Sequence, residues 1–191
     1  LNQDVIGVGL QYAFAPLRAH KLLVGTQLEF GKSDFRRSYA LGIFNADRTV
    51  GELYAPIEQV NVEGSNRQLG IYAQDVWSLN EKTTLLIGGR YNHASVKTTD
   101  RLSPTLINVE GEASPGLNND YTYQRFNPSI GLSYQPAANS TWYASAGSSN
   151  RVPTPVELAC SDPEFPCLLP NAMAADPFLE QVITTTVEGG Y

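Results

Sequence analysis

The sequence predicts an all-β fold whose antiparallel strands follow one another up and down in chain order. Apolar and polar residues alternate along several short stretches, which is typical of strands with one apolar and one polar face. The composition agrees, because 10 Tyr and 16 Gly among 191 residues favour strands and turns over helices. The connections between these stretches are alternately short and long, and this alternation indicates whether the sheet belongs to a soluble protein or to a membrane barrel.

The first two predicted strands form a hairpin. Residues 5–14 place large apolar side chains on one phase and Gly, Gln and Ala on the other. The short connection 15–20 leads to a second alternating stretch at about 21–30. A long polar stretch follows at about 31–67, and we expect it to be a loop.

A second hairpin is predicted at residues 69–92, around the polar turn Asn80-Glu81-Lys82. The side chains on its apolar phase are Leu69, Ile71, Ala73, Leu85, Ile87 and Tyr91. Gln74, Arg90 and Asn92 fall on the opposite phase. The alternation gives this hairpin one apolar face and one polar face.

A third pair of strands is predicted at about 127–134 and 141–147, joined by a short link. Long polar stretches precede and follow this pair, at about 95–123 and 151–181. A last strand begins near Thr184. The sequence therefore predicts about seven strands.

In an up-and-down sheet these alternating connections place every short turn at one end and every long loop at the other. Soluble hairpins usually have loops of about 2–5 residues, and loops beyond about 15 residues are uncommon. Short periplasmic turns and long extracellular loops are the standard arrangement of outer-membrane barrels. The sequence therefore predicts part of an antiparallel, up-and-down transmembrane β-barrel whose apolar face meets lipid.

Two features near the short turns bear on this lipid-facing phase. Asp75 falls on the apolar phase, so we expect it either at the level of the lipid headgroups or at a β-bulge that shifts the phase. Tyr12, Phe14, Trp77, Tyr134 and Trp142 lie close to the short turns. They form either an aromatic belt or an ordinary set of strand residues.

The composition argues against several other functions. A net charge of −6 with scattered Lys and Arg is unsuited to a nucleic-acid partner, which requires a clustered basic face. The sequence contains no window of about 18 consecutive apolar residues, so it predicts no transmembrane helix. The sequence contains 2 His and no recognisable nucleophile motif, so it predicts no enzyme, no cofactor and no metal site.

The two cysteines, Cys160 and Cys167, lie close together in the Pro-rich stretch 151–181. This spacing suits a small loop disulfide and an oxidising compartment. A zinc site would need two further ligands, and His20 and His93 are isolated in the sequence. The remaining alternative is a pair of free thiols in a reducing cell.

The best candidates for ligand binding are Arg36, Arg37 and Tyr39, in the first long stretch. A loop that combines Arg and Tyr can bind an anionic or aromatic ligand. The alternative is that these residues are ordinary solvated loop side chains.

Three motifs resemble those of the TonB-dependent outer-membrane receptors. IYAQDVW at 71–77, followed by GGRYN at 88–92, resembles the family's "YxQDxW … GxRY(D/N)" hairpin. WYASAG at 142–147, followed by NRVPTP at 150–155, is similar to "LYASYSRGFRAP", and VEGGY at 187–191 is similar to "E-x-G-x-R". Their order and spacing agree with the family.

The chain also departs from the family pattern. Val152 stands where an aromatic residue is usual, and Leu179-Glu180-Gln181-Val182 replaces the common "L-x-P-E". Barrels of this class have about 22 strands, and neither a globular plug domain nor a TonB box is recognised here. We therefore expect residues 1–191 to be a partial receptor barrel without its plug.

The resemblance implies uptake rather than catalysis. Such receptors lie in the outer membrane of Gram-negative bacteria and contact its lipid. They bind a scarce small-molecule ligand, often a ferric siderophore, and couple through the plug to the TonB complex. The long stretches 31–67, 95–123 and 151–181 would contribute to ligand capture. Haem, cobalamin, copper and a glycan stay open as ligands, and a passive porin-like channel or a soluble secreted β-sandwich binding module are the alternative functions.

Overall fold

The computed structural model describes residues 1–102, 118–159 and 179–191. Its main feature is a seven-stranded sheet in the order β1-β2-β5-β6-β7-β8-β9, in which all neighbouring strands are antiparallel. The strands of this sheet are β1 (Asn2–Leu17), β2 (His20–Tyr39), β5 (Ile57–Asn80), β6 (Thr83–Asp100), β7 (Asn119–Ala137), β8 (Ser140–Arg151) and β9 (Val182–Gly190). A separate two-stranded sheet pairs β3 (Gly42–Phe44) with β4 (Val50–Leu53), and one short helix, α1, spans Pro155–Ala159.

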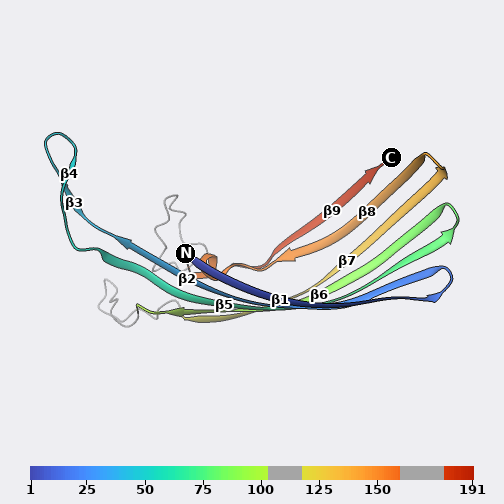
Figure 1. The fold of residues 1–191 in the computed structure, drawn as a ribbon, viewed down its shortest axis with the longest axis horizontal. Helices are drawn as coiled ribbons and strands as arrows, with labels where there is room; N and C mark the ends of the chain where they lie inside the picture. The colour runs from blue at the N-terminus through green and yellow to red at the C-terminus, as the bar shows by residue number, and fades with distance from the viewer. Residues whose placement is uncertain (103–117, 160–178) are drawn as a thin grey trace.

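The seven strands curve together into an open trough (Figure 1), with β1 at one edge and β9 at the other. Helix α1 lies on the concave side of this trough. Each strand of the main sheet lies beside its neighbours in sequence, apart from the inserted hairpin β3-β4. This arrangement confirms the predicted up-and-down section of a larger barrel. None of the helices in the described part of the chain has the length and hydropathy needed to cross a membrane.

The short turns gather at one end of the trough. They are Arg18-Ala19, Glu81-Lys82 and Ala138-Asn139, each a two-residue connection between paired strands. The hairpin β3-β4, which connects β2 to β5, lies at the opposite end (Figure 1). We call these the turn end and the loop end.

The strands reach further toward the loop end than the sequence indicates. The expected loop at 31–67 is wrong over most of its length, because β2 and β5 pair from Gly31↔Asn66 to Tyr39↔Ile57. Likewise, β6 continues to Asp100 and β7 begins at Asn119. These extensions resemble loops in the sequence because both phases carry polar residues, and the hydrogen bonds between strands maintain the extended conformation.

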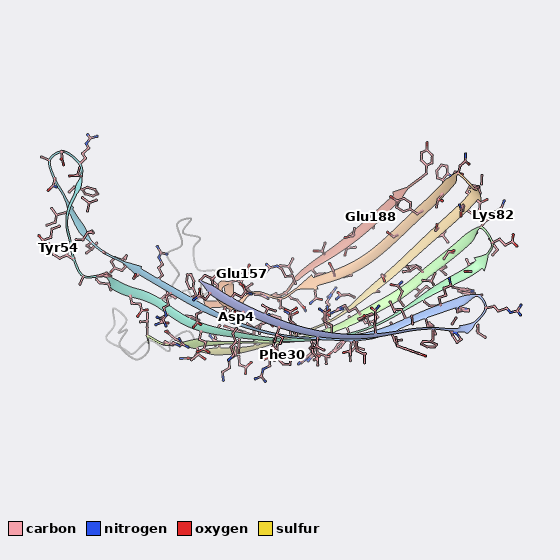
Figure 2. All side chains as sticks on the ribbon, viewed as in Figure 1. Asp4, Phe30, Tyr54, Lys82, Glu157 and Glu188 are labelled. Carbon is pink, nitrogen blue, oxygen red and sulfur yellow. The ribbon has the colours of Figure 1, made fainter. Side chains whose placement is uncertain are left out.

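The two faces of the sheet differ in composition. The inner face, on the concave side, carries Val62, Ala94, Val96 and Tyr123, which are buried where α1 packs on the sheet. The outer face carries large apolar side chains that are exposed; they include Leu10, Leu28, Ile71, Ile87, Tyr91, Phe126, Ile130 and Val187. Figure 2 shows Phe30 on this convex side and Glu157 on the concave side. A single sheet with an exposed apolar outer face suits a barrel wall rather than a sandwich.

Asp75 remains on the outer face without any β-bulge. The pairing of β5 with β2 and β6 is regular on both sides of Asp75, so the expected bulge there is wrong. His20 Nδ1 lies 2.6 Å from Asp75 Oδ2 in a hydrogen bond, and the His20 ring stacks on Trp77 with 5.0 Å between centroids. The carboxylate therefore has a partner on the neighbouring strand, which lowers the cost of placing it on an apolar face.

Candidate functional site: the inner wall

A connected set of polar side chains crosses the inner face near the middle of the trough. It begins at Gln11 on β1 and ends at Gln181, just before β9. We call this set the polar ladder. Its members are Gln11, Tyr72, Gln27, Arg90, Asn92, Asn127, Asn150 and Gln181.

Arg90 joins the first half of the ladder. Its Nε donates to Asn92 Oδ1 at 2.6 Å and its Nη2 donates to Gln27 Oε1 at 3.1 Å. The guanidinium also lies 5.6 Å from the centroid of the Tyr72 ring, within the range of a cation–π interaction. Gly70 leaves room for this arrangement, since a Cβ at that position would overlap the guanidinium.

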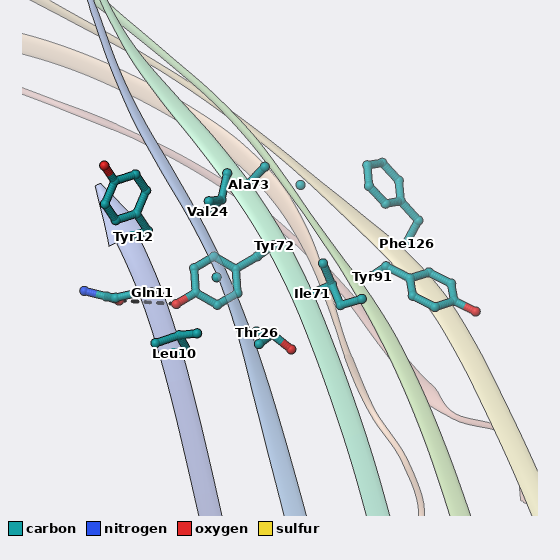
Figure 3. Close-up of a pocket in the computed structure, with 12 residues that line it drawn as sticks. Leu10, Gln11, Tyr12, Val24, Thr26, Ile71, Tyr72, Ala73, Tyr91 and Phe126 are labelled. Atoms are coloured by element: carbon teal, nitrogen blue, oxygen red, sulfur yellow. Dashed lines mark hydrogen bonds between the residues drawn. The ribbon is translucent and has the colours of Figure 1, made fainter. Parts of the chain in front are cut away.

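Tyr72 carries the ladder to the edge strand. Its side chain extends from β5 across β2, and its hydroxyl donates to Gln11 Oε1 on β1 at 3.2 Å (Figure 3). The ring lies over Gly25, where any side chain would collide with it. The glycine thus allows an aromatic ring to lie flat across the sheet.

Asn150 is the hub of the second half. Its Oδ1 accepts from Asn92 Nδ2 at 2.8 Å and from Asn127 Nδ2 at 2.7 Å, and its Nδ2 donates to Gln181 Oε1 at 2.9 Å. Gln181 Nε2 in turn donates to the Gln124 carbonyl oxygen at 3.1 Å. The side-chain amide of Asn150, at the end of β8, is therefore hydrogen-bonded to β6, to β7 and to the residue just before β9.

A cavity of ≈ 510 Å³ opens beside the ladder. Gln27, Gln74, Arg90, Ser129 and Ser149 are among its lining residues. Two buried polar atoms at this cavity, Asn127 Oδ1 and Ser148 Oγ, have no hydrogen-bond partner among the residues that the structure describes. The inner wall therefore offers both a positive charge and free hydrogen-bonding capacity toward the interior of the trough.

Between β8 and the next described residues, the chain turns inward over the wall. We call residues 152–159 the strap. Its Leu158 is only 3% exposed and packs in a cluster with Val96 and Tyr123, beside Val152 and Leu179. The strap thus covers the inner face of the sheet toward the loop end.

Glycine in β5 allows the strap to approach the wall closely. A Cβ at Gly64 would overlap the ring of Pro155 and would lie 2.6 Å from Ser33 Oγ. Because these neighbours are a proline ring and a buried serine, they have little freedom to move away. Gly64 therefore determines how closely the strap packs.

Glu157 fastens the first turn of the strap. Its carboxylate accepts from Arg151 Nη1 at 2.9 Å, from Arg151 Nη2 at 3.1 Å and from the Thr154 backbone N–H at 2.8 Å. The Thr154 hydroxyl also accepts from the Glu157 N–H at 3.2 Å, which completes a capping box. The hydrogen bonds from Arg151 are the largest cause that lowers the pKa of Glu157 below its ordinary value.

Docking of the strap is expected to weaken in acid. The folded pKa of Glu157 lies below its unfolded value, so this contribution is complete above the ordinary carboxyl range and is lost as the pH falls through the folded pKa. Hydrogen exchange of the Leu158 amide, which donates to the Thr154 carbonyl oxygen at 3.1 Å, measures the effect after correction for intrinsic rates. In Glu157→Gln, protection should no longer change over this pH window. A parent protein with pH-independent protection in the same window would contradict the assignment.

The structure separates the ligand candidates predicted from the sequence. Arg36 and Arg37 are consecutive in β2 and point to opposite faces, with Arg37 opposite the buried Val60 of the inner face. Tyr39 lies at the end of β2 and is 44% exposed. They do not form one cluster, and their role in binding stays a prediction. Cys160 and Cys167 lie outside the described residues.

The phase predicted for Gln74, Arg90 and Asn92 is confirmed, since all three line the inner cavity. The ladder itself was not predicted. Tyr72, Arg90 and Asn150 each fall in a motif of the sequence, but a motif does not show that they meet. Asn92 and Asn150 are 58 residues apart in the chain. Only the register of the sheet brings them together.

A family model described as "TonB dependent receptor-like, beta-barrel" matches residues 2–191. The chain belongs to the TonB-dependent receptor β-barrel family. Its members are receptors and transporters rather than enzymes. Among curated proteins no sequence matches the chain.

Solved structures show the same fold. The chain is similar to the copper transporter OprC, with 19% sequence identity and a TM-score of 0.64. The match covers 98% of this chain and 27% of OprC. The receptor section thus spans about a quarter of the length of that transporter.

Proposed function

We propose that this receptor section forms part of the wall of an outer-membrane transporter that takes up a scarce ligand with energy from TonB. The observation that carries the proposal is the division between the two faces of one sheet. The outer face presents exposed apolar side chains, and the inner face presents the polar ladder. A barrel in lipid requires this division, and a polar interior is what a hydrophilic ligand passes along.

The outer face supports a location in the outer membrane of a Gram-negative bacterium. At the turn end its aromatic residues include Trp77, Tyr134 and Trp142, all of which are exposed. Trp142 stacks on Tyr191 with 5.1 Å between the ring centroids. Aromatic residues at one end of an apolar band are typical of a membrane interface. This observation favours the aromatic-belt interpretation of these residues.

The inner wall favours an iron complex, such as a ferric siderophore, as the ligand. Its functional groups are amides, hydroxyls and a guanidinium, which recognise the oxygen-rich organic shell of a chelate by hydrogen bonds. Arg90 adds a positive charge that suits an anionic complex. Coupling to TonB would run through a plug domain outside residues 1–191, seated against this wall.

A transport assay with the intact receptor tests the proposal. Cells that depend on the receptor should accumulate radiolabelled ferric siderophore, and deletion of tonB should reduce the accumulation to background. Accumulation that is unchanged without TonB would show a passive porin-like channel. Copper uptake without any siderophore uptake would replace the ligand class and keep the transport mechanism.

A further inference from the structure

We infer that the outer face of this section carries a binding site for an anionic, phosphate-bearing lipid headgroup, formed by Lys32, Arg67 and Lys97. The inference rests on the proposed membrane function and goes beyond it, because it concerns the lipid around the receptor rather than the ligand inside it. The register of the neighbouring strands β2, β5 and β6 brings these residues together. These three residues are called the basic cluster.

The basic cluster lies on one face of β2, β5 and β6. Lys32 is paired with Ser65, and Ser65 is paired with Lys97, so the two lysines lie in one row on either side of the serine. Arg67 is two residues along β5 from Ser65 and therefore points to the same face. Its position is diagonal to both lysines, at a Cα distance of about 7–8 Å. All three side chains are exposed.

The cluster adjoins the apolar band of the outer face. Phe30 lies two residues before Lys32 on β2, and Leu69 lies two residues after Arg67 on β5. Both apolar side chains are therefore on the same face of the sheet as the basic cluster. A cavity of ≈ 360 Å³ at this boundary is lined by residues that include Ile6, Phe30, Lys32, Ser65 and Arg67. The cavity therefore combines apolar side chains, which suit an acyl chain, with basic groups, which suit a phosphate.

The three bases are available for a ligand. Over residues 1–102, 118–159 and 179–191 none of them forms an ion pair or a side-chain hydrogen bond, whereas nearby Arg101 is paired with Asp34 and Glu63. Asp4 and Asp120 lie at the two ends of the row of the lysines, opposite Lys32 and Lys97, and Asp4 also lines the cavity. Arg67 lies in the next row, between Phe30 and Ser95, and has no carboxylate opposite it. The three bases therefore outnumber the two carboxylates, and the surface around Arg67 is positive.

The two ends of the outer face differ in charge. At the turn end, the outer-face strand positions of the described residues carry aromatic side chains and the His20–Asp75 pair, and none carries Lys or Arg. Lys21 is paired with Val76 and points to the inner face. The bases of the outer face are thus confined to the loop end. This asymmetry selects the leaflet at the loop end as the one that supplies the headgroup.

Lipid binding to the purified intact receptor in neutral detergent tests the site. The probe is phosphatidic acid, with phosphatidylcholine as the uncharged comparison, and affinity is measured by native mass spectrometry. Each basic residue near a lipid surface contributes a factor of about 5, so K32Q/R67Q/K97Q should bind phosphatidic acid about 100-fold more weakly. The matched control, R18Q/K21Q/K82Q, removes the same charge at the turn end and should bind like the parent.

Several results would overturn the inference. They are an unchanged affinity in K32Q/R67Q/K97Q, an equal loss in the control, or displacement of the lipid by inorganic phosphate at the same concentration. The last result would indicate a site for free anions. A failure of the proposed function looks different, because the receptor would then be soluble without detergent, or siderophore uptake would not depend on TonB. Lipid binding is measured without TonB and without the transported ligand, so the two outcomes are separable.

Discussion

Replacing Asn150 by alanine is expected to disconnect the inner wall and to reduce transport strongly. The change removes the acceptor of Asn92 and Asn127 and the donor to Gln181. A buried polar group without a partner costs about 1–3 kcal/mol, so the local structure that holds β8 to β6 and β7 should be lost. Uptake of the labelled ligand, normalised to the folded receptor in the membrane, should fall by at least about 10-fold, which corresponds to about 1.4 kcal/mol.

Two variants show whether the hub itself is responsible. Asn150→Asp keeps the oxygen that accepts from Asn92 and Asn127, so it should retain more transport than the alanine variant. Asn139→Ala changes an exposed residue of the turn between β7 and β8, whose side chain forms no hydrogen bond within the described residues, and should transport normally. Equal activity of Asn150→Ala and Asn139→Ala would rule out a role for the hub.

The second large effect is expected at Gly64, where alanine should displace the strap. The added Cβ overlaps Pro155 and lies 2.6 Å from Ser33 Oγ, and overpacking of this kind costs about 1–3 kcal/mol. Hydrogen exchange of residues 152–159 should become faster, because Leu158 loses its place against Val96. The rest of the sheet should keep its protection, since the overlap is confined to the strap.

Gly31→Ala is the matched control for this substitution. Gly31 is paired with Asn66 in the adjoining strand, and a Cβ there would meet its neighbours at 3.7 Å or more, which is ordinary contact. Its exchange pattern should equal that of the parent. Normal protection of the strap in Gly64→Ala would mean that close packing at Gly64 does not hold the strap in place.

Much of the wall could be predicted from the sequence, because its alternation is regular where one face is apolar. Residues 69–92 show this best, since Ile71 and Arg90 fall on opposite phases and the structure places them on opposite faces. The extensions of β2 and β5 could not be found in this way. Both faces are polar or mixed there, so periodicity gives no signal, and pairing between distant strands determines the structure.

The candidate site was harder to predict because its contacts join residues that are far apart in the chain. The sequence predicts Asp75 either at a bulge or at the headgroup level. The pairing shows no bulge there, and the partner of Asp75 is His20 on the neighbouring strand, 55 residues away. Arg36 and Arg37 look like a pair in the sequence, but consecutive strand residues point to opposite faces. The inward course of the strap depends on the small volume of Gly64, and the sequence alone does not show which segment lies against that glycine.

The central claim is that the outer face of this sheet contacts lipid and the inner face lines a polar interior. Spin labels placed one at a time at residues 69–74 of β5, in the intact receptor in a bilayer, test it most directly. We predict that labels at Leu69, Ile71 and Ala73 collide preferentially with oxygen dissolved in the lipid. Labels at Gly70, Tyr72 and Gln74 should instead be shielded from oxygen or accessible to a water-soluble relaxation agent. Equal accessibility along β5, or an alternation of the opposite phase, would contradict the account.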